Sequence, residues 1–539
     1  MKRFIVIVSV LSLLVAALTA AGCTGTTGTN TGQAASGTVS DSPSLQNPVQ
    51  GDRGTAGTSP VLPGGNTSAS SGSRGGPGGA PPGGMGGNTS RSSGSAGGPG
   101  GIPPQGGMGP GSNMTAPSGG MGGPGGAPPS GGMPGGSSGS SSYTLSGAFT
   151  VDGTSKTETD RIYTSGTKDV SAVYVTNGGE LVLNAPTIET SGETSSNDAS
   201  SFYGLNAAVL ATSGGSVTIN GGSISTSGSG ANGAFPTGSG STIVLNGVKI
   251  RVTGGGGHAV MATNGGTLVI TDMDFETTGA NGAPLATDRG SGTVTATGGT
   301  VLASGRDSPG IYSTGIITVT DATVTATGAE AAVIEGFNSI VLKNTTLTGG
   351  VEKTGGTMIY QSMSGDADVG TGTLTMDGGS YTVTAGPAFF VTNTNAIISL
   401  SGVKMNSFTD TLIKAAGTDR WGTSGKNGGS VTFTADNTAL SGALVTDGIS
   451  SIDATLKGGS SLAGTINKAS LTLDATSTWI VTGDSALKTL SDTAGISGTS
   501  ITNIYGNGHT VTYDSSLAGN SALGGKTYTL NGGGTLKPA

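Results

Sequence analysis

From about residue 143 to the C-terminus, short runs of Val, Ile, Leu and Thr alternate with Gly and Asn. One phrase recurs: two apolar residues, a small residue and Thr, then Asn or Asp, followed by Thr-Val-Thr and a Gly-Gly turn. Its third position falls at residues 211, 237, 262, 286, 313, 335, 361, 391 and 415, so the step ranges from 22 to 30. A step near 25 residues with two or three short strands is the signature of a solenoid. The pattern predicts an all-β, parallel solenoid over residues 143–539, with about sixteen turns stacked about 4.8 Å apart.

The recurring phrase places two apolar positions next to each other in one strand. The first holds Val173, Val209, Val260, Pro284, Ile311, Val333, Ile359 and Phe389, and the second holds Tyr174, Leu210, Met261, Leu285, Tyr312, Ile334, Tyr360 and Phe390. Because neighbouring strand residues point to opposite faces, both positions cannot enter the core. If the third position points outward, the outer row is the Val, Ile and Phe of the first position. If it points inward, the outer row carries Tyr174, Tyr312 and Tyr360.

Either orientation predicts an apolar stripe on one face, and two interpretations of this stripe stay open. A loop, such as the insertion at residues 193–201, covers it, or the stripe is a binding surface. Aromatic rings along a solenoid face suit sugar rings, and nearby polar groups bond hydroxyls. The predicted ligand-binding residues are Tyr312, Glu335, Tyr360, Gln361, Asp288 and Arg289.

The first residues are typical of a targeting signal. Lys2 and Arg3 precede an apolar stretch at residues 4–17, which is short for a membrane span. The run Leu18-Thr19-Ala20-Ala21-Gly22-Cys23 resembles a prokaryotic lipobox, and Cys23 is the only cysteine. We therefore expect a signal peptide at residues 1–22 and a lipid on Cys23, which places the protein on the extracellular face of a prokaryotic membrane or cell envelope. An ordinary signal peptide with an incidental cysteine is the alternative.

Residues 23–142 are rich in Gly, Pro, Ser and Met and repeat phrases such as GGPGGAPP. Too few large apolar residues occur here to offset the entropy of ordering, so we expect a disordered tether with a span of roughly 60 Å. Sequons for N-glycosylation lie at Asn66, Asn88 and Asn113, with a fourth at Asn344 in the solenoid.

Composition narrows the classes of function. The net charge of −8 argues against nucleic-acid binding, and the presence of only two His and one Cys argues against a His/Cys metal centre. No cofactor is therefore expected, although calcium at Asp and Asn turns stays open. We expect Asn177, Asn264, Asp288 and Asn393 at turns, where these residue types tolerate left-handed backbone. Residues 440–539 repeat less regularly and are expected to form distorted turns and a cap.

The chain resembles right-handed parallel β-helix proteins of the pectin-lyase-like class, in particular their Gly-rich, adhesin-like lipoproteins. The phrases SFYGLNAAV at 201–209, MIYQSMSGD at 358–366 and DRWG at 419–422 carry this resemblance over about residues 143–539. The resemblance implies a single right-handed parallel β-helix and specifies no activity.

Enzymes that this chain resembles cut acidic polysaccharides with clustered carboxylates and an Arg or Lys. Here Asp288/Arg289, Arg306/Asp307, Glu335, Asp366/Asp368 and Asp419/Arg420 are dispersed in the sequence, so we predict no catalytic residue. The favoured hypothesis is an adhesin-like protein, anchored by its lipid, whose β-helix flank binds polysaccharide or another envelope component. The alternatives are a polysaccharide lyase or hydrolase and a structural envelope spacer without a ligand.

Overall fold

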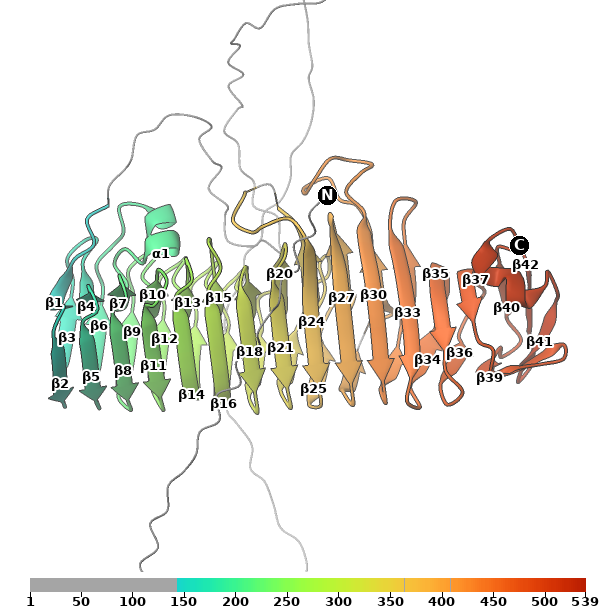
Figure 1. Ribbon diagram of the computed structural model, residues 1–539, viewed down its shortest axis with the longest axis horizontal. Coiled ribbons are helices and arrows are strands. Elements are labelled where there is room, and N and C mark those ends of the chain that lie inside the picture. Colours follow the sequence, from blue (N-terminus) through green and yellow to red (C-terminus); the bar gives the residue numbers. More distant parts are fainter. Residues whose placement is uncertain (1–142, 363, 408) are drawn as a thin grey trace, which may run out of the picture. The chain divides into compact units, whose positions relative to one another are not determined.

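The computed structural model describes residues 143–362, 364–407 and 409–539. Nearly all of its strands pair in parallel, each with the equivalent strands one turn earlier and one turn later. The chain therefore winds into a single parallel β-helix, which confirms the fold predicted from the repeat. Figure 1 shows the turns following one another from β1 to β42.

Equivalent strands stack into three faces. The first face begins with β1 (Gly147–Asp152), β4 (Ser171–Thr176), β7 (Val209–Thr212), β10 (Ala234–Thr237), β13 (Val260–Ala262), β15 (Leu285–Thr287), β17 (Ile311–Ser313), β20 (Ala332–Glu335), β23 (Thr357–Tyr360), β26 (Phe389–Thr392), β29 (Thr411–Ala415) and β32 (Ala443–Thr446). In the described chain, this face continues to sixteen strands with β35 (Ile466–Leu473), β37 (Ser485–Ser491), β40 (Thr510–Tyr513) and β42 (Thr535–Pro538), in agreement with the expected number of turns.

The other two faces follow the same order. The second face contains β2 (Ser155–Thr159), β5 (Glu180–Asn184), β8 (Ser216–Asn220), β11 (Thr242–Asn246), β14 (Thr267–Thr277), β16 (Thr293–Ala303), β18 (Ile316–Thr320), β21 (Ser339–Lys343), β24 (Thr371–Asp377), β27 (Thr394–Ser401), β30 (Gly429–Asp436) and β33 (Ser451–Lys457). The third face contains β3 (Ile162–Ser165), β6 (Thr187–Thr190), β9 (Ser223–Thr226), β12 (Lys249–Val252), β19 (Thr323–Ala326), β22 (Thr346–Gly349), β25 (Ser380–Val383), β28 (Lys404–Ser407), β31 (Ala439–Ser441), β34 (Ser461–Gly464) and β36 (Thr478–Val481). β14 and β16 bend from the second face into the third and belong to both.

The core consists of ladders of apolar side chains, because alternate residues of every strand point inward. On the second face the inward row holds Leu181, Val217, Ile243, Leu268, Val294, Ile317, Ile340, Leu374 and Ile398, all fully or almost fully buried. Burying one such side chain contributes about 1.5–3 kcal/mol relative to leaving it exposed. Apolar residues of similar size one turn apart therefore fix the register of the helix.

Glycines at one corner set how closely successive turns approach. Gly228, Gly254, Gly279, Gly305 and Gly328 each lie against the carbonyl oxygen of the glycine one turn earlier, where a Cβ atom would clash. The corner between the second and third faces instead carries polar side chains: the Nδ2 atoms of Asn220 and Asn246 each donate to the amide oxygen one turn earlier, at 2.9 Å. The row of glycines and the row of asparagines each require the same residue type at the same place in successive turns, which is why the sequence repeats.

The predicted left-handed turn positions are largely confirmed. Asn177, Asn264 and Asn393 have φ values of 54°, 51° and 54°, whereas Asp288 has no positive φ. Asp288 instead directs its side chain into a buried cluster described below.

The C-terminal turns depart from the parallel ladder. They contain β35 (Ile466–Leu473), β37 (Ser485–Ser491), β38 (Ile496–Ser497), β39 (Ser500–Tyr505), β40 (Thr510–Tyr513), the 3-10 helix η1 (Ala518–Leu523), β41 (Tyr528–Asn531) and β42 (Thr535–Pro538). The pairs β38–β39 and β41–β42 are antiparallel, so the edge of the last turn is paired within the chain. Among the described residues, no helix has the length and apolarity needed to cross a membrane.

Candidate functional site

The predicted stripe lies on the outer side of the first face and forms an apolar cluster separate from the core. Its row holds Tyr174, Leu210, Phe235, Met261, Ala286, Tyr312, Val333, Met358 and Phe390 in register. The third position of the phrase points inward at Ala211 and Ala262, which belong to the core, but outward at Ala286 and Glu335. Leu285 and Ile334 also point inward, so their assignment to the row of Tyr312 was wrong. Turns of unequal length shift the phrase by one residue, and such a shift reverses the face.

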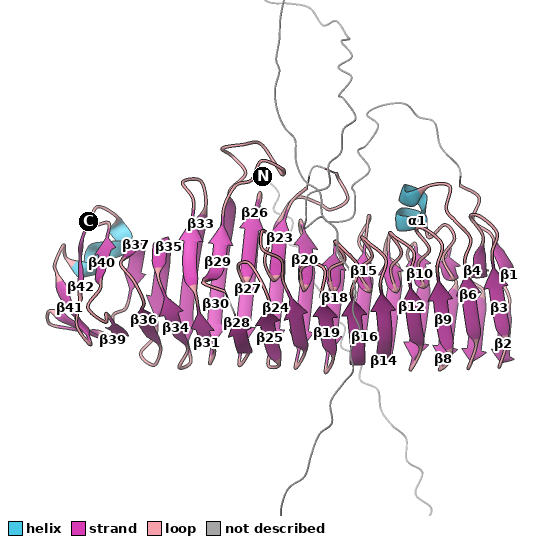
Figure 2. Ribbon diagram, turned by 180° about the vertical axis from the view of Figure 1, so that it is seen from behind, coloured by secondary structure: helices cyan, strands magenta, loops and turns pink. Residues whose placement is uncertain are grey.

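Loops cover this stripe, and Tyr312 and Phe390 are only 4% and 3% exposed. The first cover is helix α1 (Asn197–Tyr203), which lies within the predicted insertion at residues 193–201 and its continuation to Tyr203. At its C-cap, Gly204 packs so closely on Leu210 and Phe235 that a Cβ atom would lie 2.6–2.7 Å from their side chains. The loops at residues 361–370 and 416–428 cover later turns, and helix and loops rise from one edge of the β-helix (Figures 1 and 2).

The six predicted ligand-binding residues gather around a buried carboxyl group beneath loop 361–370. Glu335, at the end of β20, is 1% exposed. Its Oε2 accepts hydrogen bonds from the hydroxyls of Tyr312 and Tyr360, both at 2.8 Å. Its Oε1 accepts from the backbone N–H of Ser362 at 3.3 Å and from the Ser364 hydroxyl at 3.5 Å. The carboxyl group therefore ties three consecutive turns to the loop above them.

Asp288 and Arg289 adjoin this carboxyl group. The Arg289 guanidinium donates to Asp366 Oδ1 at 2.6 and 3.2 Å and lies 3.8 Å from the Phe202 ring centroid. It thus connects loop 361–370 with helix α1. Burial, together with the nearby Asp366 and Glu335 carboxylates, raises the pKa of Asp288 to about 8 although the Arg289 backbone N–H donates to it at 2.7 Å. Asp288 is consequently neutral in most molecules at pH 7.

Two further groups complete the buried cluster. The Gln361 Nε2 donates to the carbonyls of Ser362 and Ala367, both at 3.3 Å, while its Oε1 is buried without a hydrogen-bond partner. Burial and the Glu335 carboxylate raise the pKa of both Tyr312 and Tyr360 well above the ordinary value, so both hydroxyls stay protonated and act as donors. The structure brings all six predicted residues together, but under loops rather than on an exposed face.

A hollow of about 530 Å³ opens beside this cluster. It is lined by Glu352, Lys353, Thr354, Phe390, Lys414, Gly417, Thr418, Asp419, Arg420 and Trp421. The Trp421 ring lies 5.1 Å from the Tyr360 ring, measured between centroids, and so rests on the buried cluster. Arg420 and Lys414 lie 4.8 and 5.6 Å from the Trp421 and Phe390 ring centroids. This hollow is the candidate functional site.

Three basic side chains at this hollow have no ionic partner among the described residues. Lys353, Lys414 and Arg420 form no ion pair with a carboxylate in the part of the chain that the structure describes. They are exposed, as are Glu352 and Asp419 on the same rim. Sequence reasoning identified the pair Asp419/Arg420 but missed Trp421 as a lining residue. The available signal was the long interval between Ala415 and the next strand of the first face.

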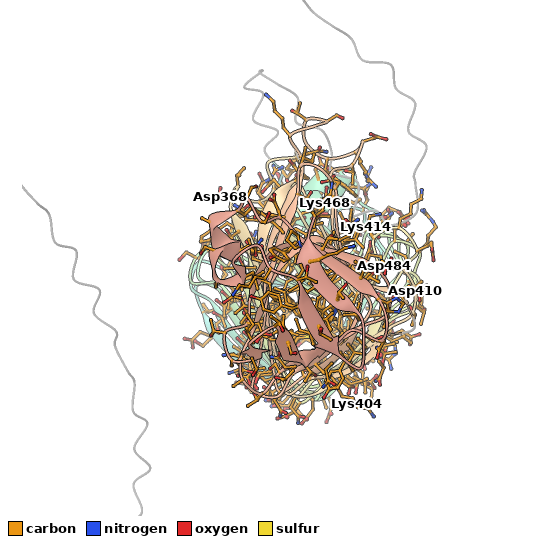
Figure 3. All side chains as sticks on the ribbon, turned by 90° about the vertical axis from the view of Figure 1, so that its right-hand side faces the viewer. Asp368, Lys404, Asp410, Lys414, Lys468 and Asp484 are labelled. Atoms are coloured by element: carbon orange, nitrogen blue, oxygen red, sulfur yellow. The ribbon has the colours of Figure 1, made fainter. Side chains whose placement is uncertain are left out.

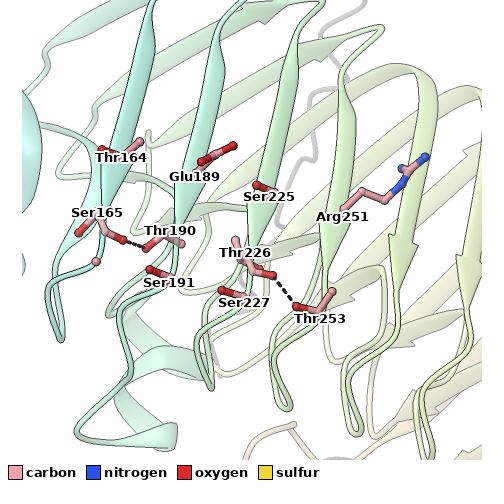
Figure 4. A pocket seen from close by; sticks show the side chains of 11 residues that line it. Thr164, Ser165, Glu189, Thr190, Ser191, Ser225, Thr226, Ser227, Arg251 and Thr253 are labelled. Carbon is pink, nitrogen blue, oxygen red and sulfur yellow. Dashed lines mark hydrogen bonds between the residues drawn. The ribbon is translucent and has the colours of Figure 1, made fainter.

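The third face has a smaller hollow, of about 320 Å³, at β3, β6, β9 and β12 (Figure 4). Here Thr190 and Thr253 donate their hydroxyls to backbone carbonyls one turn earlier, at 3.1 and 3.3 Å. Arg251 is already paired with Asp274 at 2.6 Å and Glu276 at 3.3 Å. Since these polar groups have partners within the chain, this hollow is the weaker candidate.

The remaining predicted positions lie elsewhere. Asn344 is exposed at a turn with a φ of 46°, and its amide donates to Asp321 Oδ1 at 2.7 Å. Cys23 and the sequons at Asn66, Asn88 and Asn113 fall outside the described residues. Within the described ranges, no group of three or more His, Cys, Asp or Glu side chains is arranged to hold a metal ion.

Comparisons of the chain with protein-family models, curated proteins and solved structures found no match. The geometry of the first face and its covering loops is therefore the basis for inferring the function.

Proposed function

We propose that this protein is a lipid-anchored, adhesin-like surface protein, related to pectin-lyase-like β-helices, whose flank binds carbohydrate in the hollow at Trp421. One observation supports this proposal above others: an aromatic side chain lines a hollow whose rim carries exposed basic and acidic groups. Its volume of about 530 Å³ lies within the range of roughly 300–1,000 Å³ that is typical of ligand sites.

The chemistry of the rim suits a sugar chain. Lys353, Lys414 and Arg420 supply N–H donors, while the carboxylates of Glu352 and Asp419 accept hydrogen bonds from hydroxyl groups. Trp421 and Phe390, 9% and 3% exposed, line the floor of the hollow and offer apolar edges rather than open ring faces to a sugar. Because the three cations lack ionic partners, a ligand can bond to them without first displacing a carboxylate of the described chain.

The buried cluster has a supporting role in this proposal. Glu335, Tyr312 and Tyr360 hold the loops in place, and Tyr360 supports the ring of Trp421 from below. These predicted ligand-binding residues thus position the site rather than contact the sugar. A site on rigid strands with supported loops loses less entropy on binding.

A glycan array probed with the full chain tests the proposal. We expect Trp421→Ala and Lys414→Ala to lower the affinity for the bound glycans at least about tenfold, as expected for anchor residues of an interface. Lys404→Ala is the matched control, since Lys404 is also an exposed lysine and lies at the bottom of the end view in Figure 3, away from Lys414. Equal loss in the control, or no bound glycan, would contradict carbohydrate binding, and the second result would favour the structural spacer.

The buried cluster also gives a second candidate, a polysaccharide lyase or hydrolase. Asp288, Glu335 and Asp366 form a carboxyl cluster with Arg289, a combination that such enzymes use. Substrate would reach it only if loop 361–370 moved away, since Glu335 is 1% exposed. An assay for new reducing ends and unsaturated uronates, with Glu335→Gln as the comparison, decides between the candidates. Product that disappears in this variant would favour the enzyme.

A further inference from the structure

The second face differs from the covered first face in being open and regular. Across β8, β11, β14, β16, β18, β21, β24, β27 and β30, two outward rows run from Ser216 and Thr218 to Thr432 and Thr434. Every residue in these rows is Ser, Thr, Val or Ile, and none is buried. We call these two rows the hydroxyl face. The helix and the covering loops rise from another edge, above the first face (Figures 1 and 2).

No charged residue interrupts the hydroxyl face. The first charges in its rows are Glu180 one turn before it and Asp453 one turn after it. Contact limited to these two rows would therefore desolvate no charge, which is the main cost of burying polar surface. The nearest charges on the same strands, Lys343, Asp377 and Asp436, lie two residues beyond the second row. The methyl groups of Thr, Val and Ile would gain from leaving water, and Ile316 in the middle strand is 50% exposed.

The geometry of the face favours one kind of partner. In-register pairing repeats the side chains about every 4.8 Å from strand to strand and about every 6.7 Å along each strand. The strands also keep nearly one direction along the whole ribbon (Figure 1). A second copy of this chain has the same repeat, so side chains of two such faces interdigitate over the full length, as they do between the paired sheets of a zipper. An irregular protein surface matches only a few turns.

The area is sufficient for a stable contact. Nine strands at about 4.8 Å and two rows at about 6.7 Å cover about 43 Å by 13 Å, or roughly 600 Å² on each copy. Two copies would bury roughly 1,200 Å², which is the lower end of the range for specific interfaces. We propose that the hydroxyl face pairs with the same face of a second copy, giving a twofold dimer of the β-helix. This inference does not depend on carbohydrate binding.

Cross-linking tests the dimer directly. With Cys23→Ser in the full chain, an introduced cysteine is the only thiol. A twofold axis at the middle strand β18 brings Thr318 of the two copies together. We therefore expect Thr318→Cys to give a covalent dimer with a short bismaleimide. Thr325→Cys is the control because Thr325 lies in the same turn, outward on the third face. Cross-linking of the control alone, of both variants equally, or of neither would overturn the proposal.

Sedimentation of charge variants gives an independent test. Thr295→Lys and Thr318→Lys place an unpaired charge in the contact and are expected to weaken dimerisation at least about tenfold each. Thr325→Lys should leave the dimer unchanged. Circular dichroism of each variant separates loss of pairing from loss of folding. A chain that stays monomeric at high concentration, or a dimer that tolerates Thr318→Lys, would show that the hydroxyl face is not the contact.

Discussion

Replacement of Glu335 by Leu tests whether the buried carboxyl group holds the loops over the first face. The substitution keeps a side chain of similar volume but removes the acceptor of two tyrosine hydroxyls and of two groups from loop 361–370. A buried polar group that loses its partner costs about 1–3 kcal/mol. Two tyrosine hydroxyls left without an acceptor therefore lower the free energy of unfolding by roughly 2–6 kcal/mol.

The tyrosines themselves should respond more weakly. Tyr312→Phe and Tyr360→Phe each remove one hydrogen bond without opening a cavity, while Glu335 Oε2 retains the other hydroxyl as a donor. Each change should cost about 1 kcal/mol. The effects of the two should not be additive, since both hydroxyls bond to one oxygen atom. Tyr505→Phe is the control, because Tyr505 is 39% exposed.

Two measurements check these magnitudes. Urea unfolding followed by circular dichroism gives the loss of global stability. Hydrogen exchange gives the local effect, and we expect amides of residues 362–370 to exchange at least about tenfold faster in Glu335→Leu. A Leu variant as stable as the parent, with unchanged exchange in the loop, would refute the idea that this carboxyl group fastens the loop.

Other parts of the fold give further predictions. The pKa of Asp288 is about 8 in the folded chain and about 3.9 in the unfolded chain. The contribution of Asp288 to the stability of the fold is therefore greatest below pH 4 and falls as the pH rises towards 8. Between about pH 6.5 and 8 the parent should lose roughly 1–2 kcal/mol in thermal unfolding, and a similar loss in Asp288→Asn would contradict this assignment. Gly305→Ala should cost about 1–3 kcal/mol because its Cβ would clash with backbone one turn earlier, while Gly448→Ala, with open space around it, should be neutral in urea unfolding. Asn220→Ala breaks the amide ladder and should lower the melting temperature by a few degrees, as calorimetry can measure.

The β-helix was predictable from sequence because its determinants repeat locally. Each turn needs inward Val, Ile or Leu, Asn at turns and Gly at the close corner, and these signals recur about every 25 residues. The stripe was predictable for the same reason, since two adjacent apolar positions cannot both point inward. The repeat alone could not show to which row of side chains each residue belongs. The turn from Ser313 to its partner Ile334 is 21 residues long, so counting placed Ile334 in the wrong row.

The cluster around Glu335 was predictable in composition but not in burial. Its members were named because they are polar or aromatic residues near the stripe. Whether they reach solvent depends on loop 361–370, whose path is set by contacts such as Arg289 with Asp366, which are 77 residues apart. A contact between residues so far apart in the chain cannot be predicted from the periodicity of a single sequence.

Unequal turn lengths nevertheless mark where the regular helix was modified. Partners in the first face are 36 residues apart from Val175 to Ala211, 32 from Ile359 to Val391 and 31 from Ala415 to Thr446. Turns between these pairs are 21–26 residues long. The three long intervals contain helix α1, loop 361–370 and loop 416–428, which together cover the stripe. Loop 416–428 also contributes Arg420 and Trp421 to the candidate site. Helix α1 is inserted before its first-face strand and the two loops after theirs, so the insertions lie at the two corners that flank the first face. Insertions there can vary without altering the ladders of the other two faces, since each turn packs only on its neighbours. The proposed ligand site therefore lies beside insertions, whereas the proposed dimer face lies on strands whose spacing the insertions leave unchanged.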